Sequence, residues 1–122
     1  MIERSHLTTS DGARRAEVTA HGNWVFFTGI QPQNLGGDIK EQVGEALDRL
    51  DVLMAEKGVA QSDIFTVHVW LKDMRYFSAL NAVWNKWVDA DNPPARTCVS
   101  GELYRPDLLV ELVVMAFRKT EG

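Results

Sequence analysis

Three side chains near the carboxyl end of the sequence are of types that act on small molecules: Arg96, Cys98 and Glu111. Arg96 follows a Pro-Pro pair, and Cys98 lies two residues further on, so in a strand both side chains leave the same face. Glu111 is the only charged residue between Leu108 and Phe117, where desolvating a carboxylate is costly unless it has a partner. A guanidinium, a thiol and a half-buried carboxylate therefore form a candidate site.

Each of these side chains also has a purely structural interpretation. An arginine at the start of a strand is often a surface residue, although its planar fork suits bidentate binding of a substrate carboxylate. A lone cysteine usually packs as a small apolar residue, and Cys98 has no general base close to it in the sequence. Glu111 has three possible states: an ion pair with Arg96 or with a neighbouring subunit, a carboxyl protonated because it is buried, or a carboxylate that positions water.

The two strands that carry these residues are predicted to be neighbours in the sheet. The turn at residues 104–107, Tyr-Arg-Pro-Asp, joins the strand that ends near Ser100 to the strand over residues 108–117. A tight connection of this kind sets Glu111 opposite Ser100, one diagonal step from Cys98.

The rest of the sequence predicts two helices that support these strands. Asp38 and Glu41 form a capping box that opens a helix over residues 39–57, and Gly58 ends it. Asp73 caps a second helix, whose apolar stripe runs from residue 74 to residue 88. Asn81 lies beside that stripe, where its amide is positioned either to reach a cleft or to remain on the helix surface.

Alternating apolar residues predict further strands, and together these elements define an α+β fold. The strands are expected at residues 16–20, 24–28 and 64–71, with a short edge strand over residues 1–8. The core order ββαβαββ places two amphipathic helices on one face of a mixed sheet. The other face keeps aromatic residues, because it carries either Trp24 and Phe26 or Val25 and Phe27. Such a surface is typical of an interface, and a closed homo-oligomer is the simplest cover.

Length, charge and composition limit the classes of function. The 122 residues are expected to form a single domain over 1–122, and the net charge of −4, with scattered basic residues, argues against nucleic-acid binding. The sequence lacks the ~20-residue apolar run of a membrane span, and a single cysteine suits a cytoplasmic protein. The three histidines are far apart, and phosphate-loop and dinucleotide motifs are absent, so neither a metal nor an organic cofactor is expected.

Several short motifs resemble those of the RidA (YjgF) family, many of whose members carry the label endoribonuclease L-PSP. The resemblance covers about residues 15–117. Its most specific part is Pro-Ala-Arg-Thr-Cys-Val at 94–99 followed by Val-Glu at 110–111. The chain is more similar to a small bacterial branch than to RidA itself, because residues 81–88 read Asn-Ala-Val-Trp-Asn-Lys-Trp-Val.

This resemblance implies a fold, an assembly and an activity. It implies a chorismate-mutase-like fold, a homotrimer with ligand clefts between subunits, and hydrolysis of reactive enamine or imine acids to 2-keto acids and ammonia without a cofactor. Arg96 takes the place of the arginine that holds the substrate carboxylate, and Glu111 that of the carboxylate proposed to position water. The residues that match the lining of the cleft, or align with it, are Thr28, Gly29, Asn81, Cys98 and Arg15.

One part of the implied pocket departs from RidA itself. A Pro-Tyr pair precedes the first strand of that protein, and the aligned positions here are Arg14 and Arg15, two basic residues that could attract an anion. The rival to an imine deaminase is a non-catalytic binder of small carboxylates, which requires Arg96 but no group that positions water. A ribonuclease is less favoured, because the chain is acidic and has no histidine pair near Arg96.

Overall fold

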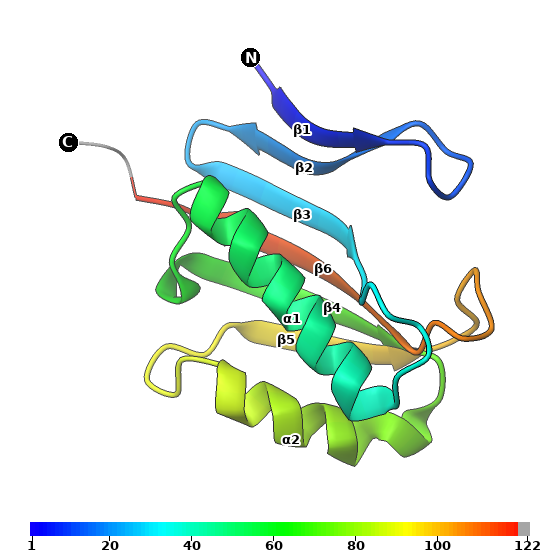
Figure 1. Cartoon of the computed structure of the whole chain (residues 1–122). Coiled ribbons are helices and arrows are strands. Elements are labelled where there is room, and N and C mark those ends of the chain that lie inside the picture. The colour runs from blue at the N-terminus through cyan, green and yellow to red at the C-terminus, as the bar shows by residue number, and fades with distance from the viewer. Residues whose placement is uncertain (120–122) are drawn as a thin grey trace.

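The computed structural model describes residues 1–119, so the last three residues of the predicted domain lie outside the described part. One six-stranded mixed sheet has the order β1-β2-β3-β6-β4-β5, and both helices lie on the same side of it (Figure 1). The strands are β1 (Glu3–Thr8), β2 (Arg15–His21), β3 (Trp24–Ile30), β4 (Ile64–Leu71), β5 (Ala95–Ser100) and β6 (Val110–Phe117). The helices are α1 (Ile39–Glu56) and α2 (Phe77–Trp87), with short 3₁₀ turns η1 (Gln61–Asp63) and η2 (Met74–Tyr76). The predicted α+β arrangement is confirmed.

Helix α1 begins and ends where its sequence predicts. The Asp38 side chain accepts the backbone N–H of Glu41 at 2.9 Å, and the Glu41 carboxylate accepts that of Asp38 at 3.4 Å, which completes the capping box. Gly58 ends the helix with φ at +67°, a conformation that costs glycine little. The residues that α1 buries against the sheet are Gln42, Val43, Ala46, Leu47, Leu50, Leu53 and Met54.

The second helix starts later than predicted. Asp73 caps the 3₁₀ turn η2, where its carboxylate accepts the Arg75 backbone N–H at 2.9 Å, and the α-helical geometry begins only at Phe77. Leu80 and Trp84 are the residues of α2 that are buried. This helix packs beside α1 and over the sheet edge that carries β5 (Figure 1).

The predicted hairpin between the last two strands is wrong. Strand β4 lies between them, pairing in parallel with β5 and antiparallel with β6. The chain leaves β4, crosses through α2 and returns as β5, and a helical crossover of this kind joins parallel neighbours. The loop at residues 101–109 then carries the chain past β4 to the centre of the sheet.

The face of the sheet away from the helices, here called the bare face, is rich in aromatic residues. Val25 and Phe27 are fully buried beneath the helices, so Trp24 lies on the bare face. Three rings surround Trp24 at centroid distances of 6.3, 5.6 and 4.9 Å, those of Phe26, Phe65 and Phe117. Phe65 is 61% exposed and Phe117 47% exposed, so nothing in the described chain covers this cluster.

Candidate functional site

Strand register places Arg96 and Cys98 on the helix-covered face of the sheet. Arg96 is aligned with Val67 of β4 and Cys98 with Val69, and both valines are fully buried under the helices. Because aligned residues of paired strands project to the same side, the arginine and the cysteine point towards α2. The predicted shared face of these two residues is confirmed.

Arg96 is held by an amide and two aromatic rings rather than by a carboxylate. Its Nη2 donates to Oδ1 of Asn81 at 2.7 Å, and its Cζ lies 5.1 Å from the ring centroid of Trp84 and 5.7 Å from that of Phe77. Its Nη1 is buried and has no hydrogen-bond partner among residues 1–119. A buried donor on a charged group is costly to leave unpaired. We call Arg96, Asn81, Phe77, Trp84 and Cys98 the arginine cluster.

Cys98 contributes packing rather than a reactive thiolate to this cluster. Burial raises the pKa of the Cys98 thiol, and the positive charge of Arg96 opposes that rise only in part. The thiol therefore remains protonated at neutral pH, where a protonated thiol is a poor nucleophile. Its side chain is half-buried and packs against the core.

Glu111 lies on the opposite face of the sheet from Arg96. It is aligned with Trp70 of β4, which is aligned in turn with Val99 of β5. The expected position opposite Ser100 is therefore wrong, because a whole strand separates β6 from β5. Trp70 is 41% exposed on the bare face, so Glu111 also projects away from the helices. Within one chain, the arginine and the glutamate do not form a single site.

A hydrogen-bonded chain of polar groups holds Glu111. Nε2 of Gln31 donates to its Oε1 at 2.6 Å, and the Tyr104 hydroxyl donates to Oε1 of Gln31 at 3.2 Å. We call Glu111, Gln31 and Tyr104 the glutamate cluster. Among the described residues none forms an ion pair with Glu111. The carboxylate lines a hollow of about 380 Å³ whose other lining residues are Asp11, Trp70, Glu102, Leu103 and Tyr104.

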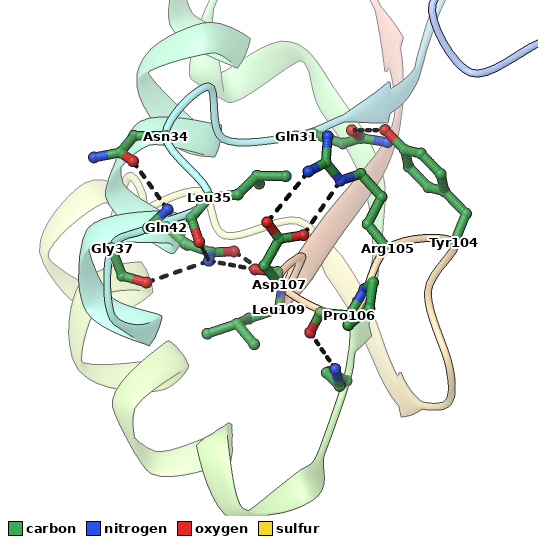
Figure 2. A network of polar contacts seen from close by, with 12 residues as sticks. Gln31, Asn34, Leu35, Gly37, Gln42, Tyr104, Arg105, Pro106, Asp107 and Leu109 are labelled. Atoms are coloured by element: carbon green, nitrogen blue, oxygen red, sulfur yellow. Dashed lines mark hydrogen bonds and ion pairs between the residues drawn. The ribbon is translucent and has the colours of Figure 1, made fainter.

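The buried amide of Gln42 fixes the two loops that carry the glutamate cluster (Figure 2). Its Nε2 donates to the carbonyls of Leu35 and Gly37 at 3.3 Å each and to that of Asp107 at 2.8 Å. Its Oε1 accepts the backbone N–H of Leu109 at 2.9 Å. Because Gln31 and Tyr104 belong to these two loops, one side chain of α1 sets how they meet.

Arg15 and Gly29 lie together at the end of the sheet nearest this cluster. The glycine has φ at +64°, where a larger residue would be strained, and a Cβ there would lie 3.0 Å from Nη1 of Arg15, which would have to shift to make room. Arg15, Gly29 and Gln31 line one hollow of about 270 Å³. Thr28, also expected at the site, is exposed beside Gly29 on β3.

The described residues provide no evident metal centre and no membrane span. Residues 1–119 contain no group of three or more His, Cys, Asp or Glu side chains arranged to hold a metal ion. Neither described helix combines the length and the apolarity that crossing a bilayer requires.

The fold of two helices on a six-stranded mixed sheet is similar to that of several solved structures. A structure of an uncharacterized protein from Pseudomonas aeruginosa has a TM-score of 0.90 at 31% sequence identity, covering 98% of this chain and 100% of that one. A member of the YjgF protein family from Neisseria meningitidis also has a TM-score of 0.90, at 29% identity, covering 99% and 98% of the two chains.

Sequence comparison leads to the same family. The family described as Endoribonuclease L-PSP matches residues 13–118, so the chain belongs to it. A RutC family protein from Haemophilus influenzae is 37% identical over 105 residues, which cover 85% of this chain and 90% of that protein. The predicted resemblance to the RidA (YjgF) family is confirmed.

The sequence pattern identified the charged residues of the site and Asn81, which holds Arg96, but missed the other residues that hold them. Trp84 is part of the core, as its helical spacing predicts, yet its ring also packs against Arg96. Gln31 lies in a loop rich in Pro and Gly, where an amide gives no periodic signal. Gln42 was detectable in principle, because it is a polar residue next to the apolar stripe of α1.

Proposed function

We propose that this chain hydrolyses small 2-imino or 2-enamino acids to 2-keto acids and ammonia, in clefts between the subunits of a homotrimer. The observation that carries the proposal is the division of the site. Arg96 has a buried donor that finds no partner in the described part of the chain, while Glu111 lies on the opposite face of the same sheet. Family membership and the uncovered aromatic face are consistent with an assembly in which one subunit supplies the arginine and its neighbour the glutamate.

The reaction requires little beyond positioning and proton transfer. Arg96 binds the substrate carboxylate in a bidentate manner and so fixes the orientation of C2. Glu111 accepts a proton from a water molecule as the water oxygen bonds to C2 of the protonated imine, and the C=N π electrons move to nitrogen, which gives a neutral carbinolamine. Glu111 returns this proton to the nitrogen. The carbinolamine hydroxyl then gives its proton to Glu111 as the C2–N bond breaks, so ammonia leaves and the hydroxyl oxygen becomes the keto oxygen.

Mixing two inactive variants tests both the chemistry and the division of the site. Arg96→Ala and Glu111→Gln are each expected to reduce turnover of 2-iminobutyrate at least ~100-fold while the oligomer persists. A mixed oligomer contains clefts with Arg96 from one chain and Glu111 from the other, so random mixing should restore about a quarter of the wild-type activity.

The matched control replaces the second partner by a chain that lacks both groups. Oligomers of Arg96→Ala with the double variant Arg96→Ala/Glu111→Gln contain no intact Arg96, so they should stay inactive. Differently tagged chains show by co-purification that subunits have exchanged. Exchange without recovered activity in the first mixture would contradict a cleft shared between subunits.

The rival function is binding of small carboxylates without catalysis, and one observation favours it. The arginine cluster is complete within a single chain, including its aromatic packing and its amide partner. A pure binder would hold 2-ketobutyrate in calorimetry, lose it in Arg96→Ala and leave ammonia release from 2-iminobutyrate at the uncatalysed rate. A pure binder would also keep its affinity for 2-ketobutyrate in Glu111→Gln, because binding alone needs no group that positions water.

A further inference from the structure

Arg15 has two guanidinium nitrogens that no described residue uses. Its Nε donates to Oδ2 of Asp11 at 3.1 Å, which is its only hydrogen bond within residues 1–119. Nη1 and Nη2 lie over Gly29, at 3.0 and 3.5 Å from the position that a Cβ would take there. Asp11 therefore orients the guanidinium through Nε. It leaves Nη1 and Nη2 without a hydrogen-bond partner among the described residues, and these two nitrogens form the edge that binds a carboxylate end-on.

Arg15 is connected to the glutamate cluster through two hollows. With Gly29 and Gln31 it lines the hollow of about 270 Å³, and Gln31 donates to Glu111. Its partner Asp11 lines the hollow of about 380 Å³ that contains Glu111. The two hollows are thus linked by Gln31 and Asp11, which gives a ligand with its reacting carbon near Glu111 a direction in which to extend towards Arg15.

The surroundings of Arg15 on its other side are positively charged. A hollow of about 890 Å³ is lined by Arg4, Arg14 and Arg15 together with Leu7, Thr8, Thr9, Ala16 and Thr19, and no carboxylate lines it. Neither Arg4 nor Arg14 forms an ion pair with a described residue. In a protein with a net charge of −4, three arginines around one hollow create a local positive potential that favours an anion.

We infer that the preferred substrates are 2-imino acids whose side chain ends in a second anionic group, held by Arg15 while Arg96 of the neighbouring subunit holds the first. This inference rests on the proposed function and adds the substrate class to it. The class is that of dicarboxylic imines, such as 2-iminosuccinate and 2-iminoglutarate. The opposite preference, for a cationic side chain, is the alternative outcome, because Asp11 and Glu102 also line the hollow around Glu111.

Turnover of matched imines measures this preference. Amino-acid oxidases with catalase generate 2-iminoglutarate and 2-iminobutyrate in the presence of the protein, and the keto acid that forms above the uncatalysed rate is followed. Arg15→Gln should lower kcat/KM for 2-iminoglutarate about 10- to 100-fold and that for 2-iminobutyrate less than about threefold. Lys40→Gln, which removes one positive charge at an exposed position of α1 that lines none of these hollows, should change both by less than about threefold. Equal effects of Arg15→Gln on both imines would overturn the inference.

Binding of keto acids separates this inference from the proposed function. If no imine is turned over, the proposed function fails, yet calorimetry with 2-ketoglutarate, 2-ketobutyrate and the keto acid of arginine still ranks the side chains. We expect 2-ketoglutarate to bind most tightly and Arg15→Gln to remove its advantage. Asp11→Asn should keep that advantage, whereas equal losses in Asp11→Asn and Arg15→Gln would reduce Arg15 to a structural partner of Asp11. Tightest binding of the cationic keto acid would also overturn the inference.

Discussion

The arginine cluster and the glutamate cluster differ in what each lacks. Within residues 1–119, Arg96 is a cation without a carboxylate partner, supported by Asn81 and two aromatic rings. In the same part of the chain, Glu111 is a carboxylate without a cation, supported by the amide of Gln31. Each charge is held by neutral groups, and strand β4 with its sheet keeps the two apart. One chain therefore carries two charged groups of opposite sign on opposite faces of the same sheet, and under the proposed function these are the two halves of a site shared between subunits.

The largest expected effect concerns the loops beneath the glutamate cluster. Gln42→Leu removes four hydrogen bonds and leaves the Leu109 N–H and three carbonyls without their partner. We expect a loss of about 3 kcal/mol in the free energy of unfolding, measured by urea titration. Gln33→Leu, at an exposed position of the same loop, should stay within about 0.5 kcal/mol. A loss below about 1 kcal/mol for Gln42→Leu would show that the loops are held by other contacts.

The next effect tests whether a carboxylate placed beside Arg96 weakens the binding of an anionic ligand. Asn81→Asp places a carboxylate at the group that now lies 2.7 Å from Arg96 Nη2, so an incoming ligand must compete with it. Binding of 2-ketobutyrate should weaken by about 1 to 2 kcal/mol, roughly 5- to 30-fold, in calorimetry. Asn81→Ala removes only the hydrogen bond and should weaken binding less. If Asn81→Asp binds as tightly as the wild type, Arg96 is not the anion site.

A smaller effect is expected from removing the neutral support of Glu111. Gln31→Leu deletes the hydrogen bond of 2.6 Å to the Glu111 carboxylate, which, under the proposed function, then loses the fixed orientation it needs to position water. We expect kcat for 2-iminobutyrate to fall about 3- to 10-fold with little change in KM, because the arginine that binds substrate is untouched. Tyr104→Phe, which removes only the outer hydrogen bond, should lower kcat less. A rise in KM without a change in kcat would place Gln31 in substrate binding instead.

The smallest effect concerns the thiol. Cys98→Ala should change kcat/KM by less than about twofold, because burial raises the thiol pKa and disfavours its nucleophilic form. For the same reason, iodoacetamide should label Cys98 slowly at pH 7.5 and faster as the pH rises towards the raised pKa. Labelling at the rate of a free cysteine at neutral pH would contradict this assignment.

Local patterns in the sequence predicted much of the fold. The capping box of Asp38 and Glu41 located the start of α1, because those two side chains bond to backbone groups only a few residues away. The spacing of Arg96 and Cys98 predicted their common face, since side chains of a strand alternate with a period of two. The aromatic bare face was predicted because two helices can cover only one face of the sheet.

What the sequence did not determine was the order of the strands. The alternation in β6 indicates which residues share a face but not which strand lies beside it, so the position of Glu111 depended on an assumed neighbour. The crossover through α2 makes β5 a partner of β4, and this pairing moves Glu111 to the side opposite Arg96. The contacts of Gln31 and Gln42 join segments far apart in the chain and leave no periodic trace.

The insertion of β4 between β5 and β6 has a consequence for the cell. Under the proposed function, a newly made or diluted monomer carries both groups yet has no complete centre, so chemistry begins only after association. Specific activity should therefore fall when the protein is diluted below the concentration at which its subunits dissociate. A protein built in this way couples its turnover to its own abundance.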